Sequence, residues 1–297
     1  MKINRIARIF TALVATGLFL ALTFATIGCG NQNSSSGGAI QVKGSDTMVN
    51  LAQMWAEDYM KSNPQVNIAV TGGGSGTGIT AMINGTTDIA DSSREMKQQE
   101  KEQVAAKGIE VVENKVALDG IAVVVNKDNK VSELSVDQLA DIFSGRITDW
   151  RDVGGDPGQI VILSRESNSG THVFFKEHIL NKGQSDSKVE YASSALLLPS
   201  SQAIVDEALQ NPKGIGYVGL GYVTGDLKAL KVKKDAASAG VTPTVASVQD
   251  GSYPVSRPLY MYTKADAGQA VQDYLAWIQG PEGQKVVEQL EFVPLTK

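Results

Sequence analysis

The sequence is poor in the side chains that bind transition metals, because its 297 residues include only two histidines and one cysteine. A histidine and cysteine metal site is therefore not expected, and we predict neither a metal nor a cofactor. The chain also lacks a basic cluster and carries a formal net charge of −5. This charge argues against nucleic acid as a partner, and it means that any anion site must be local. At 42% hydrophobic and 20% charged residues, the composition is that of a globular protein long enough for two cores.

Enzyme motifs are incomplete in the glycine-rich stretch Gly72–Gly78. The P-loop spacing is met by Gly73–Thr80, but Ile79 stands where the lysine is required. The spacing of a dinucleotide fingerprint is absent, and the nucleophile elbow fails at its last position, Thr77. A secreted phosphoester hydrolase stays open as an alternative if His172 serves Ser75 as a base. We predict instead that the protein is not an enzyme and has no catalytic residues.

The single cysteine follows a secretory signal. Basic residues at the start precede an apolar run from Ile9 to about Ile27, which ends at Gly28-Cys29. The arrangement Thr26–Cys29 resembles a bacterial lipobox, with threonine where leucine is commonest; a plain signal peptide is the alternative. We predict a signal peptide over 1–28, lipidation of Cys29, and a flexible tether over 29–38. The mature protein is then extracytoplasmic, in the periplasm or at the cell surface, and held to a membrane by its lipid.

Short apolar runs with strand character alternate with segments of helical periodicity along the rest of the chain. Such alternation with short loops predicts an α/β fold with mostly parallel sheets, and the length favours two lobes. The chain is expected to cross between lobes near Leu118–Val123 and near Ser252–Leu259. This gives a discontinuous first lobe, 39–119 with 256–297, and a second lobe, 120–255.

A strand runs into a polar or glycine-rich turn and then a helix at three places: Gly44–Met48, Gly72–Gly78 and Ser169–Thr171. Each turn leaves free backbone N–H groups at a helix N-terminus, which suits an anion. Hydroxyl side chains gather at these turns and after a third short strand: Ser45, Thr47, Ser75, Thr77, Ser92, Ser93, Ser169 and Thr171. Simple capping is the alternative for each of them. Because open α/β sheets bind ligands at the carboxyl ends of their strands, we predict that the three turns converge on one small oxyanion.

Arg165 strengthens this prediction. It ends a strand of buried type, four residues before Ser169, and a guanidinium matches a tetrahedral oxyanion with two parallel hydrogen bonds. The alternative is an ion pair with Glu166 or Asp91. Arg94 is less well placed, and both a ligand role and a structural role stay open for it.

Five stretches together carry a family resemblance: Gly44–Thr47, Gly72–Gly78, Asp88–Arg94, Ile142–Trp150 and Ser164–Thr171. Their collinear arrangement resembles the periplasmic phosphate-binding proteins of high-affinity phosphate ABC importers. The resemblance implies a two-lobed periplasmic-binding-protein-like fold of type II, with a ligand cleft between lobes joined by a two-strand hinge. It also implies inorganic phosphate as ligand and a membrane permease as partner, and we expect a monomer.

The resemblance also implies a ligand set, carried over residue by residue. It gives Thr47, Met48 through its backbone N–H, Ser75, Arg165, Ser169, Gly170 and Thr171, with Ser93 at one further position of the family's site. With Ser45 and Asp46 of the first turn added, these are the predicted phosphate-binding residues. Ser93 stands where well-known members have an aspartate that accepts the phosphate proton, a device that rejects sulfate. Asp46 is our preferred substitute for that carboxylate, with Asp91 or Ser93 itself as alternatives. A binding protein for sulfate, molybdate or tungstate therefore stays open, as does a surface adhesion or signalling protein of the same fold.

Overall fold

The computed structural model describes residues 39–184 and 186–295. The predicted signal peptide, the lipidation site Cys29 and the tether lie outside the described residues. Within the described part of the chain, no helix combines the length and the apolar character needed to cross a membrane.

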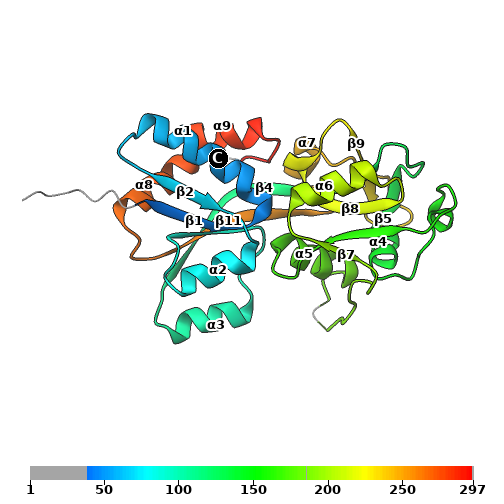
Figure 1. The fold of residues 1–297 in the computed structure, drawn as a ribbon, viewed down its shortest axis with the longest axis horizontal. Helices are drawn as coiled ribbons and strands as arrows, with labels where there is room; N and C mark the ends of the chain where they lie inside the picture. Colours follow the sequence, from blue (N-terminus) through cyan, green and yellow to red (C-terminus); the bar gives the residue numbers. More distant parts are fainter. Residues whose placement is uncertain (1–38, 185, 296–297) are drawn as a thin grey trace, which may run out of the picture. The chain divides into compact units, whose positions relative to one another are not determined.

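Strands and helices alternate for most of the chain (Figure 1). The strands are β1 Ile40–Gly44, β2 Ile68–Thr71, β3 Ile89–Ser92, β4 Val111–Asn126, β5 Glu133–Ser135, β6 Val161–Arg165, β7 Leu196–Leu198, β8 Gly214–Gly219, β9 Leu227–Ala229, β10 Lys231–Lys233 and β11 Ser256–Lys264. The α-helices are α1 Val49–Ser62, α2 Ser75–Ile83, α3 Gln98–Ala106, α4 Val136–Phe143, α5 Gly170–Phe175, α6 Ser201–Gln210, α7 Val245–Gln249, α8 Gln269–Ile278 and α9 Pro281–Gln289. A π-helix, Lys176–Leu180, continues α5.

One sheet runs through the molecule in the order β2-β1-β3-β11-β4-β8-β6-β7, and β9 also pairs with β4. The outer strands on each side pair in parallel, as the sequence predicts. The two central strands, β11 and β4, run antiparallel to each other and to the strands beside them. The sheet is therefore mixed, because the chain crosses between lobes twice and in opposite directions.

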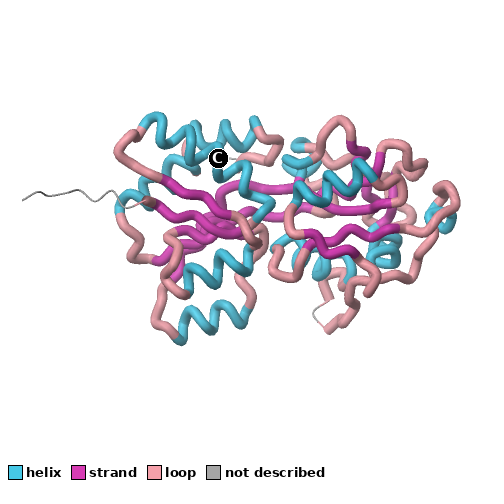
Figure 2. The backbone as a smooth tube through the Cα atoms, viewed as in Figure 1, coloured by secondary structure: helices cyan, strands magenta, loops and turns pink. Residues whose placement is uncertain are grey.

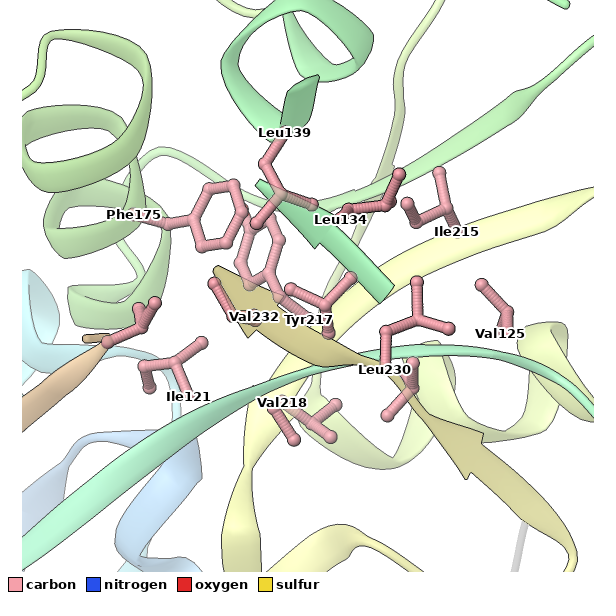
Figure 3. Close-up of a cluster of buried hydrophobic side chains, with 14 of the residues drawn as sticks. Ile121, Val125, Leu134, Leu139, Phe175, Ile215, Tyr217, Val218, Leu230 and Val232 are labelled. Carbon is pink, nitrogen blue, oxygen red and sulfur yellow. The ribbon is translucent and has the colours of Figure 1, made fainter. Parts of the chain in front are cut away.

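The hydrophobic residues form cores on either side of this crossing. On one side, α1, α8 and α9 cover one face of the sheet, and α2 with α3 covers the other (Figure 1). On the other side, a larger core surrounds β4, β6 and β8 and includes Tyr217 and Phe175, which Figure 3 shows stacked among aliphatic side chains. The predicted two-lobed α/β fold is confirmed.

Strand β4 serves both lobes, because Val116 and Ala117 belong to one core and Ile121–Val125 to the other. Figure 2 shows β4 and β11 crossing between the two groups of helices. Gly120 pairs with Ser256 at the crossing. The C-terminal segment passes beside it, where Leu118 and Val293 exchange backbone hydrogen bonds of 2.8 and 3.0 Å.

Candidate functional site

The first predicted anion turn follows β1. Ser45 donates its backbone N–H to the carbonyl of Asp91 at 3.0 Å, which holds the turn beside β3. A 3-10 turn, Asp46–Met48, then leads into α1. The Met48 N–H, predicted as a ligand, donates to the Ser45 carbonyl at 3.0 Å within this turn. The Ser45 hydroxyl donates to Ser93 Oγ at 2.8 Å, so this turn meets the end of β3.

The second turn leads from β2 into α2. Gly74 precedes the helix with φ of 90°, a conformation that costs little only for glycine. Ser75 is therefore the first helical residue, and it is fully buried. Its Oγ accepts from the Ser93 backbone N–H at 3.1 Å and lies 3.3 Å from Ser93 Oγ. Ser93 thus lies between Ser45 and Ser75.

The third turn follows β6, in the other lobe. The Ser169 side chain caps α5 by accepting from the His172 N–H. Gly170 begins the helix so close to the opposite lobe that an added Cβ would overlap Ser75 Oγ and lie 2.6 Å from Ser93 Oγ. Thr171 Oγ1 is 2.8 Å from Thr47 Oγ1 of the first turn. The predicted convergence of the three turns is present in this geometry.

Arg165, at the end of β6, is 1% exposed and makes several hydrogen bonds. Its Nη2 donates to Asp46 Oδ2 at 2.7 Å, and Nη1 donates to Ser201 Oγ at 3.1 Å. The alternative partners considered from the sequence, Glu166 and Asp91, were wrong, because the carboxylate beside Arg165 belongs to Asp46. That carboxylate also accepts from the Gly73 N–H at 3.0 Å. The Asp46–Arg165 pair therefore links the two lobes.

Two charged residues at this site were not found from the sequence. Arg257 on β11 is paired with Asp119 on β4 at 3.0 Å, and both side chains are buried. Burial raises the pKa of Asp119, and the neighbouring Arg257 opposes that rise. Arg257 Nη2 also donates to Thr171 Oγ1 at 2.9 Å and to Thr47 Oγ1 at 3.3 Å. One sequence signal could have identified this pair. Asp119 lies in the predicted crossing near Leu118–Val123, and Arg257 lies in the one near Ser252–Leu259.

Asp91 points away from this cluster. In β3 the side chains alternate between faces, and Ile89, two residues earlier, packs in the core of α1 and α8. Asp91 Oδ1 is buried without a hydrogen-bond partner among the described residues, and burial raises the pKa of Asp91 to about 8. The pKa of Tyr274 is raised mainly by burial, and the nearby Asp91 charge raises it further. The structure thus gives no contact by which the Asp91 side chain would reach an anion at the three turns.

Replacing Asp91 with asparagine is expected to stabilise the protein progressively more as pH rises from about 4 to 8, so the gain is larger at pH 8–9 than at pH 5. In the unfolded chain the carboxyl loses its proton near its ordinary pKa of 3.8, whereas the folded protein holds it to about pH 8. The folded state therefore binds more protons between these values, and stability falls as pH rises through that window. Thermal unfolding across pH 5–9 measures the effect, with exposed Asp266→Asn as control. Parallel profiles for wild type and Asp91→Asn would contradict it.

Arg94 lies next to Ser93 but is held by Glu100 through two hydrogen bonds of 2.7 and 2.8 Å. His172, considered as a base for Ser75, instead places its Nδ1 2.7 Å from the Arg165 carbonyl, and its ring lies against Tyr191. Burial lowers the pKa of His172. Among residues 39–184 and 186–295, no cluster of three or more histidine, cysteine, aspartate or glutamate side chains forms a metal site. Among the described residues, the hydrogen bonds of the His172 ring do not include one to Ser75.

A cavity of about 400 Å³ lies between the lobes beside Arg257. Arg94 and Tyr260 line it from one lobe, and Phe174 and His178 line it from the other. Residues of both lobes thus share an open space that reaches Arg94 and Arg257, while none of the predicted phosphate ligands is among its lining residues.

Two strands join the two lobes, and each lobe presents buried hydrogen-bond donors to the other. This arrangement defines a solute-binding protein. Residues 30–282 match the PBP superfamily domain. The chain belongs to the PstS family of phosphate-binding proteins. It is 35% identical over 280 residues to phosphate-binding protein PstS of Staphylococcus saprophyticus, covering 91% of this chain and 85% of that one. It is 32% identical over 316 residues to PstS of Pseudomonas aeruginosa, covering 99% and 96%.

Solved structures agree with this assignment. A crystal structure of a phosphate ABC transporter substrate-binding protein with bound phosphate, from Clostridium perfringens, superposes with a TM-score of 0.78 at 28% identity, covering 87% of this chain and 100% of that one. An ABC-type phosphate transport receptor from Vibrio cholerae gives a TM-score of 0.69 at 27% identity, covering 86% and 100%. The family resemblance inferred from the sequence is confirmed, and the family is one of binding proteins rather than enzymes.

Proposed function

We propose that this protein captures inorganic phosphate outside the cytoplasm and delivers it to an ABC importer. The observation that carries the proposal is the meeting of three strand-to-helix turns beside Arg165, with hydroxyls from both lobes within hydrogen-bond distance of each other. The names of the PstS relatives support phosphate as the ligand. The proposed ligands are those predicted from the sequence, Ser45 to Met48, Ser75, Ser93, Arg165 and Ser169 to Thr171.

The charges of the site favour binding by hydrogen bonds over net attraction. Arg165 is paired with Asp46, and Arg257 with Asp119, so these four charges cancel. Burying a phosphate dianion costs many kcal/mol unless its oxygens are matched by donors. Each hydrogen bond to a charged group contributes roughly 1.5–3 kcal/mol, so several hydroxyl and backbone N–H donors together offset that cost.

Closure of the lobes follows from where these donors lie. Thr47, Ser75 and Ser93 belong to the lobe around α1 and α2, whereas Arg165 and Thr171 belong to the lobe around β6 and α5. An anion that binds both sets favours the closed state over the open one. We propose lobe boundaries at 39–119 with 256–297 and at 120–255, which agree with the division of the cores, and a permease that recognises the closed form.

The proposal includes attachment of a monomer to the membrane through a lipid on Cys29. The support for it is the sequence alone, where Cys29 follows an apolar run and a small residue. Metabolic labelling with a fatty-acid analogue tests it, and Cys29→Ser is expected to remove the label and release the protein from membranes. Labelling that persists in Cys29→Ser would contradict the assignment.

Calorimetry and thermal shift with phosphate, sulfate, molybdate and tungstate test the proposed ligand. We expect phosphate to bind tightly and raise the unfolding temperature, with sulfate far weaker. A stronger response to one of the other three oxyanions would assign the protein to that ligand. An absence of response to all four would contradict an oxyanion-binding function.

Asp46 is the proposed acceptor of the phosphate proton, because its carboxylate lies beside Arg165 and is only 15% exposed. We expect Asp46→Asn to narrow the preference for phosphate over sulfate, since an amide can donate to a fully ionised oxygen where a carboxylate repels it. Competition of each anion against labelled phosphate measures the ratio. An unchanged ratio would move the role to Ser93, which occupies the position between Ser45 and Ser75.

A further inference from the structure

Arg257 is placed at the junction of the two lobes. It lies on β11 directly opposite Asp119 of β4, next to the Gly120–Ser256 pair at which the chain crosses. Its side chain is 2% exposed, and its Nε and Nη2 both donate to Asp119 Oδ2. The guanidinium also lies over the ring of Phe174, 5.4 Å from its centroid. Position, charge and plane of the guanidinium are thus fixed by residues of the crossing and of α5.

The same guanidinium touches one threonine from each lobe. Nη2 is 3.3 Å from Thr47 Oγ1 and 2.9 Å from Thr171 Oγ1, and the two hydroxyl oxygens are 2.8 Å apart. A guanidinium has donors only, and one Nη2 hydrogen goes to Asp119, so the other is shared between the two threonines in a three-centre hydrogen bond and occupies an acceptor position on both oxygens. The hydroxyl hydrogens must therefore point away from Arg257. One of them joins the two threonines, and the other remains available to an acceptor such as an anion oxygen.

Arg257 also retains an unused donor. Its Nη1 is buried without a hydrogen-bond partner among the described residues. A buried guanidinium nitrogen without a partner is costly, and such groups are uncommon in folded proteins.

We infer that Arg257 is a positioning residue of the anion site, which orients the hydroxyls of Thr47 and Thr171 toward a bound oxyanion from a fixed point on the crossing strands. This inference rests on the proposed function. Because each threonine belongs to a different lobe, Arg257 contacts both only when the lobes close. Arg257 therefore couples two features of the site. The hydroxyls of Thr47 and Thr171 take the orientation that suits an anion only in the closed state of the protein.

The test is a double-mutant cycle of Arg257→Lys and Thr171→Val, read by phosphate calorimetry. Lysine keeps the charge beside Asp119 but lacks the planar fork that reaches both threonines. We expect Arg257→Lys to weaken phosphate binding about tenfold or more. Thr171→Val should then cost much less in the Arg257→Lys protein than in the wild type, because its hydroxyl is no longer oriented.

The control is Arg94→Lys, which alters another buried arginine–carboxylate pair that contacts neither threonine. In the double variant of Arg94→Lys and Thr171→Val, the fold-change in phosphate affinity should equal the product of the two single fold-changes. If Arg257→Lys fails to fold, the paired variant Arg257→Gln with Asp119→Asn removes both charges and serves in its place. Two outcomes would overturn the inference without touching the proposed phosphate binding. One is that the fold-changes of Arg257→Lys and Thr171→Val simply multiply in the double variant, and the other is that Arg257→Lys leaves the phosphate affinity unchanged. A wild-type protein that binds no phosphate would instead refute the proposed function.

Discussion

Replacing Arg165 with alanine is expected to weaken phosphate binding at least about a hundredfold. The substitution removes a buried cation whose Nη2 lies 2.7 Å from Asp46. It also leaves the Asp46 carboxylate without that partner, next to the place where the anion binds. Lost donors and new repulsion between like charges act in the same direction, so this effect should be among the largest in the site.

Calorimetry with phosphate measures the loss, and thermal unfolding without ligand checks that the variant is folded. Arg146→Ala is the control, because Arg146 is half exposed and pairs with Asp141 of α4 in the same lobe. Adding Asp46→Asn to Arg165→Ala should recover part of the affinity by removing the unpaired carboxylate. Near-native affinity of Arg165→Ala would refute the assignment of Arg165 to the site.

Gly170→Ala is expected to reduce phosphate affinity by a similar factor, about a hundredfold, through a different mechanism. An added methyl group would overlap Ser75 Oγ, and it would lie 2.6 Å from Ser93 Oγ. Both contacts are with the opposite lobe, so the methyl group opposes closure without disturbing either core. The variant should therefore fold with near-native stability and remain open when phosphate is added.

Small-angle scattering with and without phosphate measures closure, alongside calorimetry for affinity. Gly225→Ala is the matched control, because an added Cβ there meets no atom within 4 Å. A Gly170→Ala protein that compacts on phosphate addition as the wild type does would show that the turns do not approach each other as closely in solution.

The three anion turns could be predicted from sequence because their signals are local. A short apolar run, then glycine or serine, then helical periodicity specifies each one without knowledge of the rest of the chain. Strands as short as β5, β7, β9 and β10 carry no clear sequence signal, since a three-residue strand depends on the partner it pairs with. In the longer strand β4 only Ile121–Val125 forms a continuous apolar run, whereas Val111–Lys115 includes polar residues and is largely exposed.

The pairing of charges could not be predicted, because it depends on register between distant strands. Arg257 meets Asp119 across 138 residues through one position of the β4–β11 ladder. In the same way, Asp46 rather than Asp91 reaches Arg165, because the strand alternation of β3 turns Asp91 toward the core. Residue type identified the charged candidates, and only the fold decided which of them meet.

The C-terminal segment gives the junction a third strand-like connection. Leu118 is bonded to Val293 on one side and paired with Pro258 of β11 on the other, and Phe292 and Val293 pack in different cores. We expect three adjacent segments to resist twisting more than two would, which favours a bend near Leu118 as the motion between the lobes. We therefore expect substitutions at Val293 to change the amplitude of that bend, and with it the form offered to a permease, without removing any proposed phosphate ligand.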